Sequence, residues 1–381
     1  MSAELIAYRG ASIFDGECRF EDHALIVDGA RIQGIIPDRE VPSTARKVDL
    51  DGGTLAPGYV DLQVNGGDGV MFNDDPSVAT LRRMADAHAR LGTTSILPTL
   101  ITDTPDQTRA AIHAVQQAIV EGVPGIMGLH LEGPHLSTAR KGAHDPGLIR
   151  PMEASDLLML IDAARHLPCL KVTIAPEVVT PEQIRALHEA GITVSLGHTN
   201  ADFDTCVRAV EAGAGCVTHL FNAMSQIGNR EPGVVGAALG LGVLSAGLIA
   251  DGIHVHPQNL ATALRAKAGP GAIFLVSDSM ATAGSDIVDF VLNGRPIRRN
   301  YGRLTLEDGT LAGADLDLTT AVRVLVQDVG QPFDEALRMA TSSPAKVVRQ
   351  SHLAGSLATG MPANFILLNE AIQLVDIWRG E

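Results

Sequence analysis

From about residue 57 onward, short apolar runs alternate with longer amphipathic stretches. The short runs predict strands, and the amphipathic stretches, several of which begin at Ser, Asp or Pro and stop at Gly, predict helices. The predicted strands are Tyr59–Val64, Thr93–Leu100, Ile126–Leu131, Leu170–Ala175, Ile192–Leu196, Cys216–His219, Leu244–Ala250 and Ala272–Val276. The predicted helices include Ser77–Leu91, Pro105–Glu121, Pro181–Ala190, Ala201–Ala212 and Pro257–Ala268. Eight βα units predict an α/β fold of the TIM-like (β/α)8 barrel type.

The barrel pattern is interrupted between Gly284 and Gly313, where Asn-Gly and Asp-Gly pairs indicate hairpin turns. We expect this insertion to lie near the barrel mouth. Two further helices are predicted after it, near Asp317–Val329 and Phe333–Val348.

The two ends of the chain carry a different pattern. The first 55 residues are rich in short strand signals, and the tail Leu357–Trp378 is strand-like again. We therefore predict one small discontinuous β-sandwich domain made of residues 1–56 and 350–381. The barrel itself is predicted to occupy residues 57–349.

Composition excludes several classes of protein. Of the 381 residues, 45% are hydrophobic and 19% are charged, which allows a sizeable core and argues against disorder. The net charge of −15 argues against a general nucleic-acid or anionic-membrane surface, although one anionic metabolite can still bind through local donors. Four cysteines without a CxxC pair, no visible secretion signal and no apolar run of membrane-spanning length predict a cytoplasmic protein.

Polar residues with metal-binding capacity stand at the ends of most predicted strands. They are Gln63, Asn65, Glu132, Glu177, His198, His219, His254 and Asp278. One such histidine is more often structural, but several converge on the catalytic, C-terminal face of a barrel. Glu132, His198 and His219 offer one carboxylate oxygen and two imidazole nitrogens, a set that holds a catalytic zinc and leaves a position for water.

Asp278 is then the candidate general base and acid, with a turn or helix-cap aspartate as the alternative. Glu177 has two open interpretations, which are orientation of a metal ligand and capping of a loop.

Several motifs occur in a fixed order along the chain. They are Gly128-Leu-His-Leu-Glu-Gly-Pro134, Lys141-Gly-Ala-His144, Leu196-Gly-His-Thr199, Thr218-His-Leu-Phe-Asn-Ala-Met224, Arg230-Glu-Pro-Gly233 and Ala250-Asp-Gly-Ile-His254. The ordered set resembles the N-acetylglucosamine-6-phosphate deacetylases of the amidohydrolase superfamily. The likeness fits from Pro57 to Ser343, and Ala354-Gly-Ser-Leu357 extends it almost to the C-terminus.

The resemblance implies roles for individual residues. Glu132, His198 and His219 match the metal ligands, and Asp278 matches the catalytic acid/base. The matching substrate contacts are Ala143 and His144 for the sugar or acetyl group, Asn222 and Ala223 for a main-chain phosphate corner, Arg230 as the cationic phosphate partner, Asp251, Gly252, Ile253 and His254 as a further substrate segment, and Leu311, Ala312 and Gly313 as a loop over the sugar. A homodimer whose partner subunit completes the phosphate site is also implied.

One departure concerns the first strand, where many relatives carry His-x-His for a second metal. Here the positions are Gln63 and Asn65, a vacant second-metal position, so we expect one divalent metal per subunit, with zinc first and iron as the alternative. His135 is interpreted as a wall of the substrate cleft, with a metal contact as the alternative.

The expected reaction is hydrolysis of N-acetylglucosamine 6-phosphate to glucosamine 6-phosphate and acetate. The alternatives are another amide hydrolase or deaminase on the same barrel, and a non-catalytic scaffold. The sugar epimer and a role in recycling or in catabolism stay open.

Overall fold

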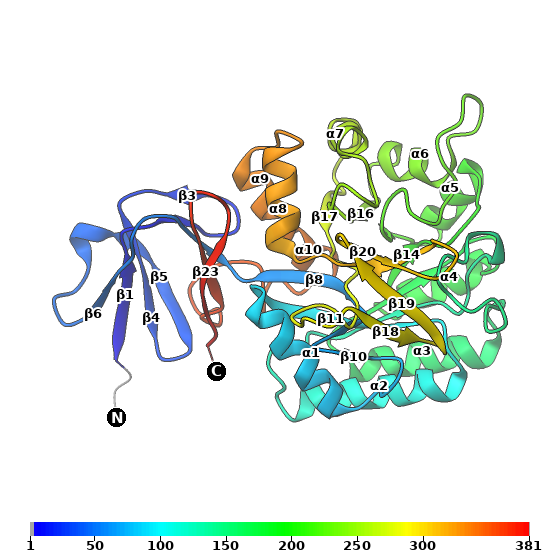
Figure 1. Ribbon diagram of the computed structural model, residues 1–381, viewed down its shortest axis with the longest axis horizontal. Helices are drawn as coiled ribbons and strands as arrows, with labels where there is room; N and C mark the ends of the chain where they lie inside the picture. The colour runs from blue at the N-terminus through cyan, green and yellow to red at the C-terminus, as the bar shows by residue number, and fades with distance from the viewer. Residues whose placement is uncertain (1–3, 381) are drawn as a thin grey trace.

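The computed structural model describes residues 4–380, and its largest sheet is a barrel of eight parallel strands (Figure 1). The strands are β8 (Tyr59–Val64), β11 (Thr93–Ile101), β12 (Leu129–Glu132), β13 (Leu170–Ile174), β14 (Thr193–Leu196), β15 (Cys216–Val217), β16 (Ser245–Leu248) and β17 (Ile273–Leu275). Each strand pairs with the next in sequence. The seam between the first and last strands is closed just beyond β17, where the backbone N–H of Asp278 donates to Gln63 O at 3.1 Å. The predicted barrel is confirmed.

Helices cover the outside of the barrel. They are α1 (Val78–Arg90), α2 (Pro105–Val120), α3 (Ala154–His166), α4 (Pro181–Glu189), α5 (Phe203–Glu211), α6 (Gly233–Gly240), α7 (Pro257–Ala266), α8 (Leu318–Gln327), α9 (Phe333–Ala340) and α10 (Ser342–Val347). Side chains cap several of them, for example Ser77, which accepts the N–H of Thr80 before α1. Within residues 4–380, no helix combines the length and the apolar character needed to cross a membrane.

The single helix predicted over Phe333–Val348 is wrong, because the chain breaks between α9 and α10. The break lies at Thr341, where φ is −128° and ψ is −88°. Pro344 explains it, since a proline has no N–H to donate to the carbonyl of residue 340 and its ring would clash with that carbonyl in a continuous helix.

The N- and C-terminal segments form two further sheets beside the barrel (Figure 1). One contains β1 (Leu5–Arg9), β4 (His23–Asp28), β5 (Arg31–Pro37) and β6 (Arg46–Asp49). The other contains β2 (Ser12–Phe14), β3 (Arg19–Phe20), β7 (Thr54–Pro57), β22 (Phe365–Leu368) and β23 (Leu374–Trp378). The sheets share an apolar cluster in which the Tyr8 ring lies 5.0 Å from Phe365 and 5.2 Å from Trp378. This confirms the discontinuous β region, and its boundaries after residues 56 and 349 stay predictions.

The insertion predicted at the mouth folds as an antiparallel sheet. Its strands are β18 (Asp289–Leu292), β19 (Arg295–Asn300), β20 (Arg303–Thr305) and β21 (Leu311–Ala314). Leu292, Ile297 and Leu304 form an apolar cluster with Met71, of the short hairpin β9 (Gly66–Gly67) and β10 (Val70–Met71), and with Met280. The insertion therefore packs as a roof against residues that follow β8 and β17.

The barrel interior below the mouth is polar. His130 Nε2 lies 2.8 Å from Thr173 Oγ1, and Thr218 Oγ1 lies 2.7 Å from Thr173 Oγ1 and 2.6 Å from Ser195 Oγ. Lys171 Nζ is 3.4 Å from His130 Nε2, and burial lowers the pKa of Lys171. This network is the floor beneath the functional site.

Candidate active site

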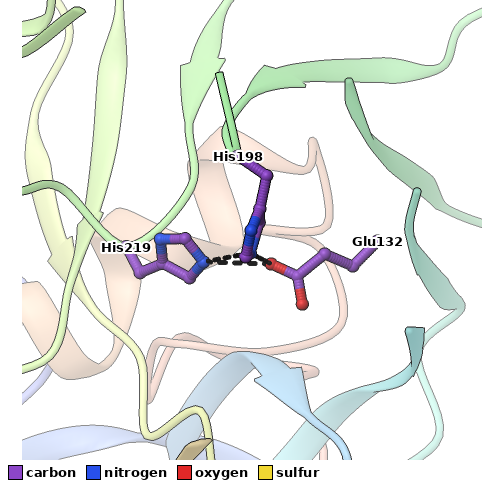
Figure 2. Close-up of side chains that lie close together, drawn as sticks. All are labelled: Glu132, His198 and His219. Atoms are coloured by element: carbon purple, nitrogen blue, oxygen red, sulfur yellow. Dashed lines mark hydrogen bonds and ion pairs between the residues drawn. The ribbon is translucent and has the colours of Figure 1, made fainter. Parts of the chain in front are cut away.

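Glu132, His198 and His219 converge at the C-terminal mouth of the barrel. Glu132 ends β12, and the two histidines follow β14 and β15. His198 Nε2 lies 3.3 Å and His219 Nε2 lies 3.1 Å from Glu132 Oε1, and the two Nε2 atoms are 3.0 Å apart (Figure 2). All three residues are buried, and their ligand atoms lie within 4.8 Å of one another.

This arrangement fits a divalent cation. His198 Nδ1 donates to Arg140 O at 2.9 Å, which leaves the lone pair of Nε2 for the centre of the cluster. Burial opposes ionisation of Glu132, but the neighbouring imidazoles of His198 and His219 outweigh it and hold its pKa well below the ordinary value. The backbone supports the convergence, because φ is 46° at His198 and 30° at His219. Left-handed geometry at non-glycine residues is costly and is typical of functional sites.

Asp278 lies beyond β17, also with a positive φ of 51°. Its Oδ1 accepts hydrogen bonds from Gln63 Nε2 at 3.1 Å and from Asn65 Nδ2 at 2.8 Å. Gln63 Nε2 also lies 3.1 Å from Glu132 Oε1. Burial raises the pKa of Asp278, and the nearby Glu132 carboxylate adds to the effect. The residues at the predicted vacant second-metal position thus direct amide nitrogens at both carboxylates.

His144 is a neutral donor in the same site. Its Nδ1 lies 2.8 Å from the Thr102 hydroxyl and accepts the backbone N–H of Thr102 at 3.3 Å. Because a backbone N–H can only donate, the ring proton is on Nε2, which lies 3.8 Å from Glu132 Oε2. Burial lowers the pKa of His144 well below its ordinary value, and the His198 charge adds to this. An uncharged imidazole therefore presents an N–H close to the candidate metal ligands.

A cavity of about 250 Å³ opens above these residues. The sequence-predicted residues that line it are Asn65, Glu132, Ala143, His144, His198, His219, Asn222, Ala223, His254, Asp278, Leu311 and Gly313. The predicted residues outside its lining are Gln63, Arg230, Asp251, Gly252, Ile253 and Ala312. Of these, Gln63 contacts the cavity residue Asp278 through a hydrogen bond.

Asp251 acts on the cavity through His254. Its Oδ2 accepts the His254 Nδ1–H at 2.6 Å, and its Oδ1 accepts the backbone N–H groups of Ile253 and His254, each at 2.8 Å. His254 therefore has a fixed ring with Nε2 free for a ligand. Arg230, by contrast, is exposed on the loop before α6.

Glu177 and His135 lie outside the cavity lining. Glu177 accepts the hydroxyl of Thr199 and, at 2.7 Å, the backbone N–H of Asn200, so it caps the loop that follows His198. The His135 ring is buried, with Nδ1 3.2 Å from Arg150 O. The interpretation of His135 as a cleft wall is wrong, because its side chain faces Arg150 and Asp156 and does not line the cavity.

Several lining residues were missed from the sequence, namely Ile101, Gly142, Ile249, Met280, Leu292 and Thr310. Ile101 ends β11, the second barrel strand, so its position alone could have placed it at the mouth. Leu292 and Thr310 belong to the insertion, and the sequence contains no signal that points them at the site.

A parallel barrel with two histidines, a glutamate and an aspartate at its C-terminal mouth defines a metal-dependent hydrolase. The model of the Amidohydrolase family matches residues 54–377, and that of the NagA composite domain matches residues 7–55. The chain therefore belongs to the amidohydrolase family.

Individual relatives agree with this assignment. The chain is 43% identical over 332 residues to N-acetylgalactosamine-6-phosphate deacetylase of Shewanella sp. (strain ANA-3), covering 86% of this chain and 82% of the relative. It is 35% identical over 357 residues to N-acetylglucosamine-6-phosphate deacetylase of Haemophilus influenzae, covering 93% and 92%. The crystal structure of N-acetylglucosamine-6-phosphate deacetylase from Pasteurella multocida matches with a TM-score of 0.94 at 37% identity, covering 99% and 98%. The resemblance drawn from the ordered motifs is confirmed.

Proposed function

We propose that this chain hydrolyses the acetamide of N-acetylglucosamine 6-phosphate to glucosamine 6-phosphate and acetate. The observation that carries the proposal is the convergence of Glu132, His198 and His219 beside Asp278 and the neutral His144 in one cavity. The relatives named as deacetylases of amino-sugar phosphates support the substrate class.

Glu132, His198 and His219 would hold one divalent metal per subunit, zinc first and iron as the alternative. When bound, such an ion polarises the acetamide carbonyl and lowers the pKa of a water molecule. His144 donates its Nε2–H to the oxygen that gains negative charge as the tetrahedral centre forms.

Asp278 takes the proton of the attacking water as the new C–O bond forms. It then gives that proton to the amine nitrogen as the C–N bond breaks, because an amine cannot leave as an anion. The products are therefore acetate and the free amino sugar, and Asp278 returns to its ionised form.

The phosphate is proposed to bind at the corner formed by Asn222 and Ala223. Ala223 has a φ of 49°, a conformation that alanine rarely adopts, as expected where main-chain groups must face a ligand. Among the described residues, no lysine or arginine lines the cavity. We infer that the cation comes from Arg230 of a second subunit, because Arg230 is exposed and does not line the cavity of its own chain.

A second candidate substrate is N-acetylgalactosamine 6-phosphate, the C4 epimer, because the Shewanella relative is named for it. The test is to measure metal per chain and kcat/KM for both epimers, with the unphosphorylated sugars as controls. The proposal expects metal-dependent acetate release from a phosphorylated sugar and much weaker release from the free sugars. Metal-replete protein that releases acetate from neither epimer would refute it. A higher kcat/KM for the galactose epimer would make N-acetylgalactosamine 6-phosphate the preferred substrate.

A further inference from the structure

We propose that Gln63 and Asn65 act as an amide clamp, a pair of positioning residues that fix the catalytic carboxylate of Asp278. This inference rests on the proposed role of Asp278 as the proton-transferring group. It gives a function to the two positions where a second-metal ligand pair is replaced by amides.

The geometry of the amide clamp is specific. Gln63 Nε2 and Asn65 Nδ2 both donate to the same oxygen, Asp278 Oδ1, at 3.1 Å and 2.8 Å. Both residues are almost fully buried, with 0% and 1% of their surface exposed. Because both hydrogen bonds end on Oδ1, Oδ2 remains available to exchange a proton with water and then with the amine.

The orientation of the two amides is compelled by their neighbours. A carboxylate accepts hydrogen bonds and cannot donate them, so an amide beside it must present its NH2 group. Consistent with this, Gln63 Oε1 and Asn65 Oδ1 are buried without a hydrogen-bond partner among residues 4–380. Both amides thus leave their oxygen unsatisfied in order to direct their NH2 group at Asp278. This indicates that donation to the carboxylate determines the orientation of the two amides.

The amide clamp is built on the barrel seam. Besides its side-chain bond, Gln63 accepts the backbone N–H of Asp278 at 3.1 Å, and Asn65 donates its backbone N–H to Ser279 O at 2.9 Å. The seam thus brings both amides to the carboxylate from one direction. Gln63 additionally donates to Glu132 Oε1 at 3.1 Å, so one amide group lies between the two carboxylates and reduces their repulsion.

Asn65→Leu is the informative variant, because the described contacts of Asn65 include no candidate metal ligand. Removal of one hydrogen bond to a charged group predicts a fall in kcat of about tenfold or more, with little change in KM or metal content. Asn73→Leu is the matched control, since Asn73 is also a buried amide at the mouth but bonds Ile101 and Asp103 instead. We expect Asn73→Leu to keep kcat within about threefold, because its side chain has no bond to Asp278 through which to act on proton transfer.

A double-mutant cycle tests whether Asn65 acts through Asp278. Rates are measured by single turnover with enzyme in excess, so that slow variants are included. In the Asp278→Asn background, Asn65→Leu should lower the rate by less than about threefold, since the carboxylate it positions is already gone. Equal losses in both backgrounds, or a loss confined to KM, would overturn the amide clamp while leaving the deacetylase proposal intact.

A crystal structure of Asn65→Leu supplies a readout independent of activity. A displaced or rotated Asp278 carboxylate is expected, and an unmoved one would overturn the proposal. If Asn65→Leu does not fold, Asn65→Ala removes the same donor without adding bulk and carries the same cycle. Near-native activity of Asp278→Asn itself would instead refute the mechanism on which the amide clamp rests.

Discussion

Replacing Asp278 by asparagine separates proton transfer from structure. The carboxamide oxygen can accept the two hydrogen bonds that now end on Oδ1, and the new NH2 group takes the place of Oδ2. Each of these bonds becomes a bond to a neutral acceptor and weakens by about 1 kcal/mol. Loss of a buried negative charge beside Glu132 acts in the opposite direction, since burial and Glu132 raise the pKa of Asp278. We therefore expect Asp278→Asn to fold and to keep its metal.

Catalysis should respond far more strongly than stability. The amide cannot accept the proton of water, so the general base and acid contribution of ~10² to 10⁴ is lost from kcat. This corresponds to about 2.7 to 5.4 kcal/mol in the activation barrier. Because Asn65 and Gln63 keep a partner, KM for the phosphorylated sugar should change little.

The assay combines acetate release, metal analysis and a pH profile. In the native enzyme Asp278 must be ionised, so activity should fall as the pH decreases through its raised pKa, and this acidic limb should be absent from the residual activity of Asp278→Asn. A variant that keeps its metal and a kcat within about tenfold of the native value would refute the assignment. His144 and His254 would then be the next candidates for the proton carrier.

Three further outcomes are expected. His198→Ala or His219→Ala should lose metal and activity together, as elemental analysis beside kcat will show, and unchanged metal content would remove that residue from the ligand set. Arg230→Ala should raise KM for the phosphorylated sugar about tenfold or more but leave the weak activity on the free sugar unchanged. If the arginine acts across a dimer, mixing the Arg230→Ala and Asp278→Asn proteins should restore activity. Verified heterodimers without recovery would argue for a site within one chain. Burial lowers the pKa of His88 from 6.5 to about 4, so its contribution to stability is full above pH 6.5 and is lost as the pH falls toward 4, by about 2 kcal/mol at pH 5. In His88→Gln the amide can still donate to Gly66 O. The free energy of unfolding in urea should therefore fall less between pH 7 and pH 5 for this variant than for the native protein. Equal falls would contradict a neutral His88.

The sequence predicted the strands and the ligand types because both depend on local pattern. Buried parallel strands are continuous apolar runs, and the residue at the end of such a run faces the mouth wherever the strand pairs. Glu132, His198, His219 and Asp278 could therefore be found without knowledge of the loops.

The remaining features depend on contacts between distant segments. The bond from Thr102 to His144 joins residues 42 positions apart, and the bond from Asn65 to Asp278 joins residues 213 apart. Neither leaves a periodic trace in the sequence. The backbone at His198 adopts φ = 46°, which residue type alone does not predict for histidine.

The discontinuous sheet has a consequence for how the chain is made. In the five-stranded sheet β7 lies between β2 and β22, and Pro57 pairs with Phe365, which is 365 − 57 = 308 residues later. At about 5–20 residues per second, roughly 15–60 s of synthesis separate these partners. During that interval one edge of β7 is unpaired, a hazard limited by its length of four residues and by Pro57 at its end. All eight barrel strands precede residue 276. They therefore emerge from the ribosome before β22 and β23, the strands that complete the β domain begun at the N-terminus.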